Sequence, residues 1–458
     1  MKRCAAFPLL MLLSACAVGP DYRRPDVALP DAYYRSVPGA TGRSIADAGW
    51  WQVFGDPQLT TLINEALHDN LDLAIAASQI VQAEAQVAAA RSPLFPRVLG
   101  QVQGSRSNQN VTFTTASSFL AALALSWEID FWGRYLRATE AARASLLASE
   151  DARRSVIASL VSSVAQQYLQ LQGLRQRLEI VQRTAIAQRD TLRLVTLLSQ
   201  QGVQSAAEVR QAESQVLTTE NQIPGIELQI AQAEDALALL LGKAPRSFDT
   251  SAGLTAAAVL PQVPAGVPSE LLDRRPDIRQ AEQQLVAANA NIGVAKAQFF
   301  PSISLTGSLG RASDTLRGVV SSGGQNVRSV AASVNQPLFE GGALVANYDI
   351  ARAQAEQAAV AYRRTILIAL QEVSDALVAF DRDRVAAEGN RNRVEVSAEA
   401  LRLAQLRFRS GVISFLEVLD TQRQLLAAEL DLNASELNQR LSAVQLYKAL
   451  GGGWNPGK

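Results

Sequence analysis

The feature that most constrains this 458-residue chain is an internal repeat, because its two halves carry the same motifs in the same order. Segment 70–96 aligns with 275–301 at an offset of 205 residues, and both copies end on Phe-Pro. Further along, Gly202 matches Gly411 at an offset of 209, and a valine follows each glycine. Chance alignment of alanine-rich helices does not explain such pairs. The sequence therefore predicts a tandem duplication, with the same succession of elements in each half.

Each predicted repeat contains four segments: a helix, a Ser/Thr/Gly-rich section with alternating side chains, a very long proline-free helix and, after a glycine, a last helix. In repeat 1, residues 57–242, these segments are 57–91, 95–130, 133–199 and 205–241. In repeat 2, residues 269–451, they are 269–298, 300–339, 342–409 and 414–450. Segment 243–268 links the repeats, and 452–458 is a C-terminal tail. Pro224 and Gly225 should break the last helix of repeat 1 only.

The third segment of each repeat is too long for a compact domain. A helix of about 65 residues extends roughly 100 Å at 1.5 Å per residue. Apolar residues recur in it at spacings of three, four and seven, as at Leu160, Val164 and Leu171. This pattern predicts long helices that pack in a coiled-coil-like array.

The second segment of each repeat alternates with a period of two, which is typical of β-strands. Apolar side chains fall on one face and small or polar side chains on the other. The first set is Phe119, Ala121, Leu123, Leu125, Trp127, Ile129, Ile303, Leu305 and Leu309; the second includes Ser302, Ser304, Thr306 and Ser308. We expect two strands in each repeat, joined through 107–117 and 312–326, with Trp127, Phe131 and Trp132 near a membrane interface. Alternation alone suits a half-buried soluble sheet equally well.

The number of strands decides between these alternatives. Four strands cannot close a barrel, and a sheet of four leaves two open edges. Three chains would supply twelve strands. The predicted fold class is therefore mainly α with a transmembrane β part: a long coiled-coil helical barrel, and four strands per chain that contribute to a trimeric twelve-stranded β-barrel.

The start of the chain is predicted to be a bacterial lipoprotein signal. An apolar run too short to span a bilayer leads into Leu-Ser-Ala-Cys at 13–16, which matches the lipoprotein cleavage box. Residues 1–15 are then a signal peptide, and Cys16 carries acyl chains, including palmitate, at the head of a lipidated segment, 16–56. Ala17 follows the cysteine, and a residue other than aspartate at this position permits sorting to the outer membrane.

Composition argues against enzymatic, metal and nucleic-acid functions. The cysteines are Cys4, which leaves with the signal, and Cys16, and the only histidine is His68. Thiolate, Cys–His and Ser–His–Asp sites therefore have few candidates. Basic and acidic residues balance at 43 each, and no basic run is interleaved with aromatic residues, which argues against nucleic-acid binding. We expect no cofactor, no metal and no catalytic residue.

Several motifs together resemble the TolC-like outer-membrane efflux lipoproteins of the NodT type, which are the outer-membrane factors of tripartite efflux systems. The resemblance covers essentially the whole mature chain. Its main motifs are Val18-Gly19-Pro20-Asp21-Tyr22, Trp50-Trp51, Trp127-Glu128-Ile129-Asp130-Phe131-Trp132-Gly133, Asp273-Arg274-Arg275-Pro276-Asp277 and Leu338-Phe339-Glu340-Gly341-Gly342.

The resemblance implies a homotrimer in the outer membrane, lipid-anchored, with its helical tunnel in the periplasm and an equatorial belt that includes the linker 243–268. The implied partners are outer-membrane lipid, a periplasmic adaptor of the membrane-fusion type and an inner-membrane pump of the resistance-nodulation-division (RND) class. The pump would supply the energy, and the channel would conduct drugs or other small molecules passively, as in multidrug resistance.

The helix pairs should turn at Gly202 and Gly411, which we predict to be the periplasmic tips. Glu417 and Asp420 follow the second turn three residues apart, so a helix places both carboxylates on one side. In the family, positions matching Leu416 and Asp420 form the constriction of the resting tunnel. We therefore expect Leu416 to be an apolar plug, with Glu417 and Asp420 forming acidic rings that favour cations.

In repeat 1, Glu208 is the counterpart of Glu417, whereas Gln211 replaces the second acid, so the two tips should differ. Arg402, Arg407 and Arg409 precede the second tip and could tie neighbouring helices by salt bridges. Alternatively, the acids are solvated residues favoured at a helix start, and the arginines are plain surface charge.

Two other functions compete with the channel. A structural coiled-coil envelope lipoprotein would explain the helices but gives no reason for the alternating sections. A periplasmic enzyme using paired carboxylates would need a substrate cleft that the helical patterns do not suggest. We interpret Asp273 to Asp277 as a helix start with structural ion pairs, since Pro276 suits the first turn of a helix and Asp273 can cap it.

Overall fold

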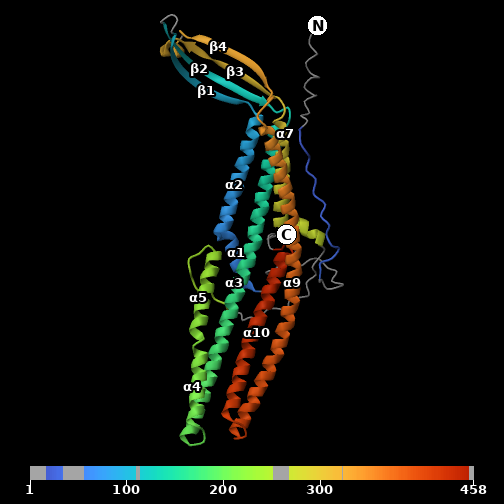
Figure 1. The fold of residues 1–458 in the computed structure, drawn as a ribbon. Helices are drawn as coiled ribbons and strands as arrows, with labels where there is room; N and C mark the ends of the chain where they lie inside the picture. The colour runs from blue at the N-terminus through green and yellow to red at the C-terminus, as the bar shows by residue number, and fades with distance from the viewer. Residues whose placement is uncertain (1–16, 35–55, 110–113, 251–267, 322, 453–458) are drawn as a thin grey trace. The chain divides into compact units, whose positions relative to one another are not determined.

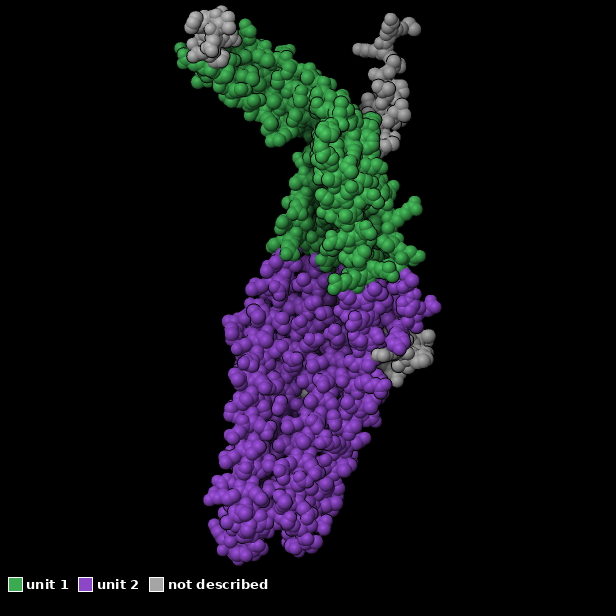
Figure 2. All heavy atoms as spheres, in the orientation of Figure 1, with its two compact units in different colours: residues 1–27, 77–151, 279–365 green, residues 28–76, 152–278, 366–458 purple. Residues whose placement is uncertain are grey.

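The computed structural model describes residues 17–34, 56–109, 114–250, 268–321 and 323–452. The predicted signal peptide, Cys16 and most of the linker 243–268 lie outside these residues. The chain forms two compact units (Figure 2). Unit 1 consists of residues 1–27, 77–151 and 279–365, and unit 2 of residues 28–76, 152–278 and 366–458.

Unit 1 contains one antiparallel sheet of four strands in the order β1-β2-β3-β4 (Figure 1). The strands are β1 Arg97–Gln109, β2 Thr114–Ile129, β3 Ser302–Ser313 and β4 Gln325–Asn335. The four strands per chain expected from the sequence are confirmed. The connections were predicted less well: β1 and β2 extend into 107–117, and a short helix, α8 Leu316–Val320, lies within 312–326.

The register of the sheet brings the apolar positions of different strands together. Leu123 lies opposite Leu309, and Trp127 opposite Leu305. On the other face, the hydroxyls of Ser304 and Ser333 are 2.7 Å apart, as are those of Ser308 and Ser329. Residues directly opposite each other in an antiparallel pair share a face, so the sheet has one apolar face and one small, polar face.

The helices of the two predicted repeats follow one another in a similar order. In chain order they are α1 Pro57–Asp69, α2 Leu71–Arg91, the 3-10 turn η3 Ser92–Leu94, α3 Arg134–Gln200, α4 Ala206–Glu220, α5 Ile223–Leu240, the 3-10 turn η5 Pro268–Glu270, α6 Leu271–Arg274, α7 Pro276–Ala297, α9 Ala343–Arg409 and α10 Phe415–Ala449. The two long helices, α3 and α9, have 67 residues each. Among the described residues, no helix is both long enough and apolar enough to cross a membrane.

Three of the predicted helices are divided. Asn70 interrupts 57–91: its backbone is extended, and its side chain accepts from the Leu73 amide and donates to the Leu240 carbonyl. Arg275 interrupts 269–298, as expected for the residue before a proline, which is disfavoured from helical conformation. The break that Pro224 predicts lies between α4 and α5, whereas α10 is continuous.

Arg275 is buried, and it stabilises the region where α7 begins. Its guanidinium forms ion pairs of 2.7 Å with Asp277 and Glu372 and donates to the Ala449 carbonyl at 3.1 Å. These acids raise the pKa of Arg275 despite its burial, which acts in the opposite direction. The arrangement agrees with the predicted helix start held by structural ion pairs.

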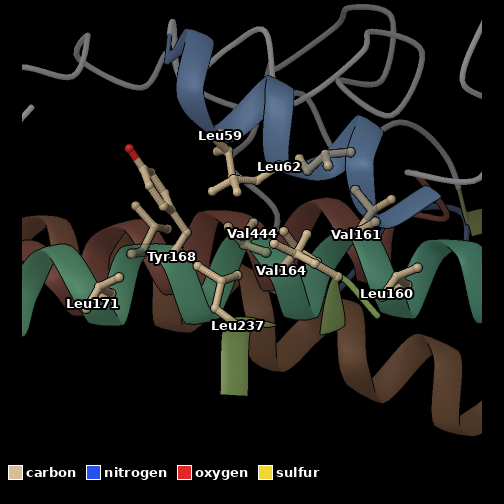
Figure 3. Packing of buried hydrophobic residues seen from close by; sticks show 14 of the residues in the cluster. Leu59, Leu62, Leu160, Val161, Val164, Tyr168, Leu171, Leu237 and Val444 are labelled. Carbon is tan, nitrogen blue, oxygen red and sulfur yellow. The ribbon is translucent and has the colours of Figure 1, made fainter. Parts of the chain in front are cut away.

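The largest core of unit 2 joins helices from both repeats. Leu59 of α1, Val164 of α3, Leu237 of α5 and Val444 of α10 meet in it and are almost fully buried (Figure 3). In the same core, the Tyr168 hydroxyl donates to the carboxylate of Asp56, whose other oxygen caps α1. Burial raises the pKa of the Tyr168 hydroxyl most, and the hydrogen bond to Asp56 raises it further.

A glycine after α5 provides the first test of this packing. Gly242 has a φ of 66°, and a Cβ at this position would collide with the Asp69 carbonyl oxygen. Gly202 has a φ of 75° but nothing within 4 Å. Left-handed backbone costs a non-glycine residue about 1–2 kcal/mol, so both alanine variants should lose stability. We expect Gly242→Ala to lower the thermal unfolding temperature clearly more than Gly202→Ala does, as measured by circular dichroism. Equal decreases in the unfolding temperature would contradict the collision with Asp69.

Candidate functional site

The two helical hairpins of unit 2 end in turns of the same construction. In the first, Gly202 is left-handed, its amide donates to the Ser199 carbonyl, and the Val203 amide donates to Leu198. In the second, Gly411 and Val412 make the corresponding bonds to Phe408 and Arg407. Both turns are Schellman motifs, which end a helix with a left-handed glycine. The predicted tip glycines therefore lie at the turns.

The helices that leave the two turns begin differently, although both start with Ser-x-x-Glu. In repeat 1, the Ser205 side chain accepts from the Glu208 amide, and the Glu208 carboxylate accepts from the Ser205 amide at 2.8 Å. In repeat 2, Ser414 makes no such side-chain bond. Glu208 is therefore engaged in a capping box, whereas Glu417 is not.

The start of α10 separates its exposed and buried residues sharply. Leu416, Glu417 and Asp420 are exposed together on one side, and the Leu416 side chain has 53% of its surface accessible. The Asp420 carboxylate accepts from Gln424 Nε2 at 2.7 Å. The predicted plug and both predicted acids of repeat 2 thus form one continuous patch at the second tip, which we call the tip patch.

The opposite side of α10 is anchored in a small core. Phe415 is fully buried, and its ring centroid lies 5.6 Å from that of Phe408 on α9. Val195 of α3 and Ala212 of α4 belong to the same cluster, so both hairpins share it. This core fixes the helix that carries the tip patch.

The sequence-based predictions did not include this aromatic pair. A usable signal was present, because Phe408 and Phe415 flank Gly411 closely, whereas their repeat-1 counterparts are Ser199 and Ala206. Glu208 lies at the start of α4, at the first turn, and its carboxylate bonds to Ser205, whereas Glu417 and Asp420 lie at the start of α10, at the second turn.

The three arginines before the second tip differ in their contacts. Arg402 forms two bonds of 2.7 Å with Glu399, one turn earlier on the same helix, and lowers the pKa of that glutamate. Arg407 and Arg409 are exposed, and neither forms an ion pair within the described residues. Their guanidinium groups are therefore available to a neighbouring chain.

Groups suited to catalysis are scarce in the described part of the chain. His68 is exposed and contacts the carboxylate of Asp69. No group of three His, Cys, Asp or Glu residues there could hold a metal ion. The features that distinguish the site are its two helix turns, its exposed leucine and its exposed acids.

Comparison with known proteins assigns the family. The profile of the outer membrane efflux protein family matches residues 62–243 and 267–452. The probable efflux pump outer membrane protein TtgC of Pseudomonas putida is 37% identical over 455 residues, covering 97% of this chain and 94% of the relative. The cation efflux system protein CusC of Escherichia coli is 36% identical over 468 residues, covering 99% and 100%.

Solved structures show the same fold. The open state of the MtrE outer membrane channel of Neisseria gonorrhoeae has a TM-score of 0.88 at 33% identity, covering 96% of this chain and 99% of that one. The outer-membrane channel OprN has a TM-score of 0.88 at 30% identity, covering 96% and 100%.

These matches define the class of protein: the fold is that of an outer-membrane efflux channel. The role of such channels is transport and not enzymatic catalysis. The chain belongs to the outer membrane efflux protein family.

Proposed function

We propose that three copies of this chain form a passive, gated duct. Their twelve strands would close a barrel in the outer membrane, and their helices would continue as a tunnel in the periplasm. Molecules delivered by an inner-membrane pump and a periplasmic adaptor would leave the cell through it. One observation carries this proposal: the four-stranded sheet has two open edges, at β1 and β4.

Open edges of this length require a partner. β1 has 13 residues and β4 has 11, and each presents a row of backbone groups without a partner strand in the described residues. Proteins cover or close such edges, since exposed ones pair with other chains. Pairing β4 of one copy with β1 of the next would satisfy the backbone groups of both edges at once. The barrel would close when three copies have joined.

The faces of the sheet support a barrel that is wet inside. Val102 is 80% exposed and Val330 92% exposed on the apolar face, and no layer of this chain covers them. Valine on an uncovered face suits lipid better than water. The serine pairs on the other face suit a water-filled lumen.

We also infer that the chain arose by duplication. The order helix, strand pair, 67-residue helix, glycine turn and final helix occurs twice, with two Schellman turns built on equivalent residues. This origin explains why the tips are alike in backbone and yet differ in side chains.

The tip patch is the proposed gate. Repeated around a threefold axis, Leu416 would form an apolar constriction, and Glu417 and Asp420 would form rings of negative charge that favour cations. The capping box supports a smaller part for Glu208, because its carboxylate already accepts two bonds from Ser205. Arg407 and Arg409 are the arginines best suited to tie adjacent copies together.

The lipid anchor proposed at Cys16 fits the contacts of the residues that follow it. The Val18 amide donates to the Trp132 carbonyl at 3.0 Å. Further along, Arg24 forms a bidentate pair with Glu282 of α7. The first contact holds Val18 near the helix-side end of the sheet, where an acyl chain on Cys16 could enter the inner leaflet of the outer membrane, and the second fixes the following residues along α7.

The proposed partners are a periplasmic adaptor and an inner-membrane RND-type pump, which would supply the energy. The names of relatives cite toluene, cations and pyoverdine as cargo. Such variety among similar channels supports selection of cargo mainly by the pump and adaptor. Deleting the gene and measuring susceptibility to a panel of solvents, metals, dyes and antibiotics would identify the cargo of this chain.

The assembly itself is testable with the purified, lipidated protein. We expect a heat-modifiable trimer on unheated denaturing gels and discrete conductance steps in planar bilayers. A protein that stays monomeric, or a trimer that never conducts, would refute the duct and favour a structural coiled-coil lipoprotein of the envelope.

A further inference from the structure

Three of the four strands carry an arginine at nearly the same position relative to their loop end. Arg106 precedes the end of β1 at Gln109 by three residues, and Arg311 precedes the end of β3 at Ser313 by two. Arg328 follows the start of β4 at Gln325 by three. We call these three residues the arginine row.

All three members lie on the apolar face of the sheet. Arg311 lies opposite Ala121, and Arg328 opposite Leu309. Arg106 is four residues beyond Val102, which also lies opposite Ala121, so the period of two places it on the same face. The strands have one other arginine, Arg97, which lies at the helix-side end and on the polar face, opposite Ser126.

Toward the helix-side end from these arginines, the strands carry only apolar residues on this face, including the residues directly opposite Arg311 and Arg328. These apolar residues are Val98, Gly100, Val102, Gly104, Phe119, Ala121, Leu123, Leu125, Trp127, Ile129, Ile303, Leu305, Gly307, Leu309, Val330, Ala332 and Val334. Arg311 is eight residues from Ile303, or about 26 Å along a strand, which at a tilt of about 40° is a height of about 20 Å. Since the lipid-facing band of a barrel is about 25 Å tall, the arginine row lies near its edge.

The two edges of this band differ in chemistry. At the helix-side end, Trp127 donates to the Leu94 carbonyl, and Trp132 stacks on Phe300 with ring centroids 4.5 Å apart. Aromatic residues of this kind are typical of a membrane interface. At the loop end, the apolar face carries arginine side chains instead of aromatic ones.

Little in the described residues neutralises the arginine row. Arg106 and Arg328 are exposed and form no ion pair there. Arg311 is half-buried and donates to the Gly324 carbonyl at 3.3 Å, and its buried Nε has no hydrogen-bond partner. The nearby acid in sequence is Asp314, which accepts from Ser313. Positive charge therefore predominates at this edge, and the exposed guanidinium groups of Arg106 and Arg328 are accessible to a ligand.

We propose that Arg106, Arg311 and Arg328 bind the phosphate groups of lipid A, the anionic lipid of the outer leaflet. The proposal rests on the proposed function, which directs the loop end of the strands outward. The flat guanidinium fork matches phosphate oxygens bidentately, and the aliphatic stem can lie along the acyl chains. In a trimer, nine such arginines would lie on the lipid-facing side of the barrel, toward its loop end.

Native mass spectrometry of the purified trimer tests this directly. Bisphosphorylated lipid A is compared with lipid A of the same acyl chains from which both phosphates have been removed. We expect the phosphorylated form to bind the unsubstituted protein at least about tenfold more tightly, because charge-assisted hydrogen bonds to phosphate are lost without it. Equal binding of the two lipids would overturn the proposal without any variant.

Variants then locate the site. Arg106→Gln, Arg311→Gln and Arg328→Gln combined should abolish the preference for phosphate and leave binding of the dephosphorylated lipid unchanged. Two single variants provide a matched comparison. Arg328→Gln should reduce the preference for phosphorylated lipid A, whereas Arg97→Gln should not, because Arg97 lies on the other face and at the other end of the strands. A preference retained by the triple variant would overturn the assignment.

The same preparation separates two kinds of failure. If the unsubstituted protein forms neither a heat-modifiable trimer nor a conducting channel, the proposed function fails. If trimer and conductance are intact but binding is indifferent to the phosphates, only the lipid A inference fails.

Discussion

Val330→Arg should greatly reduce the yield of detergent-resistant trimer. Val330 lies in the middle of β4, on the apolar face, and is 92% exposed in the single chain. If that face meets lipid, an arginine here, two residues inside Arg328, costs up to about 2–4 kcal/mol according to its depth, and a trimer contains three of them. If the face meets water instead, replacing so exposed a valine should change stability very little. The measurement is the trimer fraction on unheated gels and the unfolding temperature in detergent.

Ala331→Arg is the matched control for this experiment. Ala331 is the next residue of the same strand, is also exposed, and lies opposite Thr306 on the polar face. Facing a water-filled lumen, it should accept arginine with the trimer intact. Equal tolerance of both substitutions would contradict a lipid-facing apolar surface, and equal loss would indicate that β4 accepts no long side chain on either face.

The sheet was predictable from the sequence because its information is local. A strand alternates its side chains whatever its neighbours do, so the pattern at 302–309 specifies which side chains share a face. The observed register, with Leu123 opposite Leu309 and Glu128 opposite Ser304, combines the patterns of two strands consistently. What the pattern cannot specify is where pairing stops, since polar residues such as Ser107 and Asn108 pair through their backbones equally well.

The helix break at Asn70 shows the limit of local information. Neither glycine nor proline marks the position, and the Asn70 side chain bonds to Leu240, which is 170 residues away in sequence. Propensity is a weak guide where a tertiary contact decides the backbone. The glycine turns were predictable, by contrast, since a left-handed residue after a long helix strongly favours glycine.

The same limit applies to the candidate site. Ser205 and Glu208 have the same spacing as Ser414 and Glu417, yet only the first pair forms a capping box. The second helix is fixed instead by Phe415 in the core beneath it. Sequence spacing therefore located both tips but could not determine which of the two glutamates has its carboxylate free.

This difference between the tips leads to the second large effect. Leu416→Ala combined with Asp420→Ala should raise the resting conductance of the trimer in planar bilayers several-fold. Truncation would remove the apolar plug, and loss of the second acid would remove its bond to Gln424 along with its charge. Because Leu416 is 53% exposed in the single chain, its truncation takes little from the hydrophobic core, and the trimer should remain assembled.

Gln211→Ala in repeat 1 is the matched control, since Gln211 occupies the position equivalent to Asp420 and is also exposed. It should leave the resting conductance unchanged. Phe415→Ala provides the opposite comparison: removing a fully buried phenylalanine costs about 3–5 kcal/mol, so it should lower the unfolding temperature as well as disturb the gate. If the double variant conducts more while its unfolding temperature is unaltered, its effect is removal of the plug. A lowered unfolding temperature would instead indicate that the tip has lost its packing. If the double variant conducts no more than the unsubstituted trimer, the constriction lies elsewhere in the tunnel, and the exposure of the tip patch must be explained by docking of another chain.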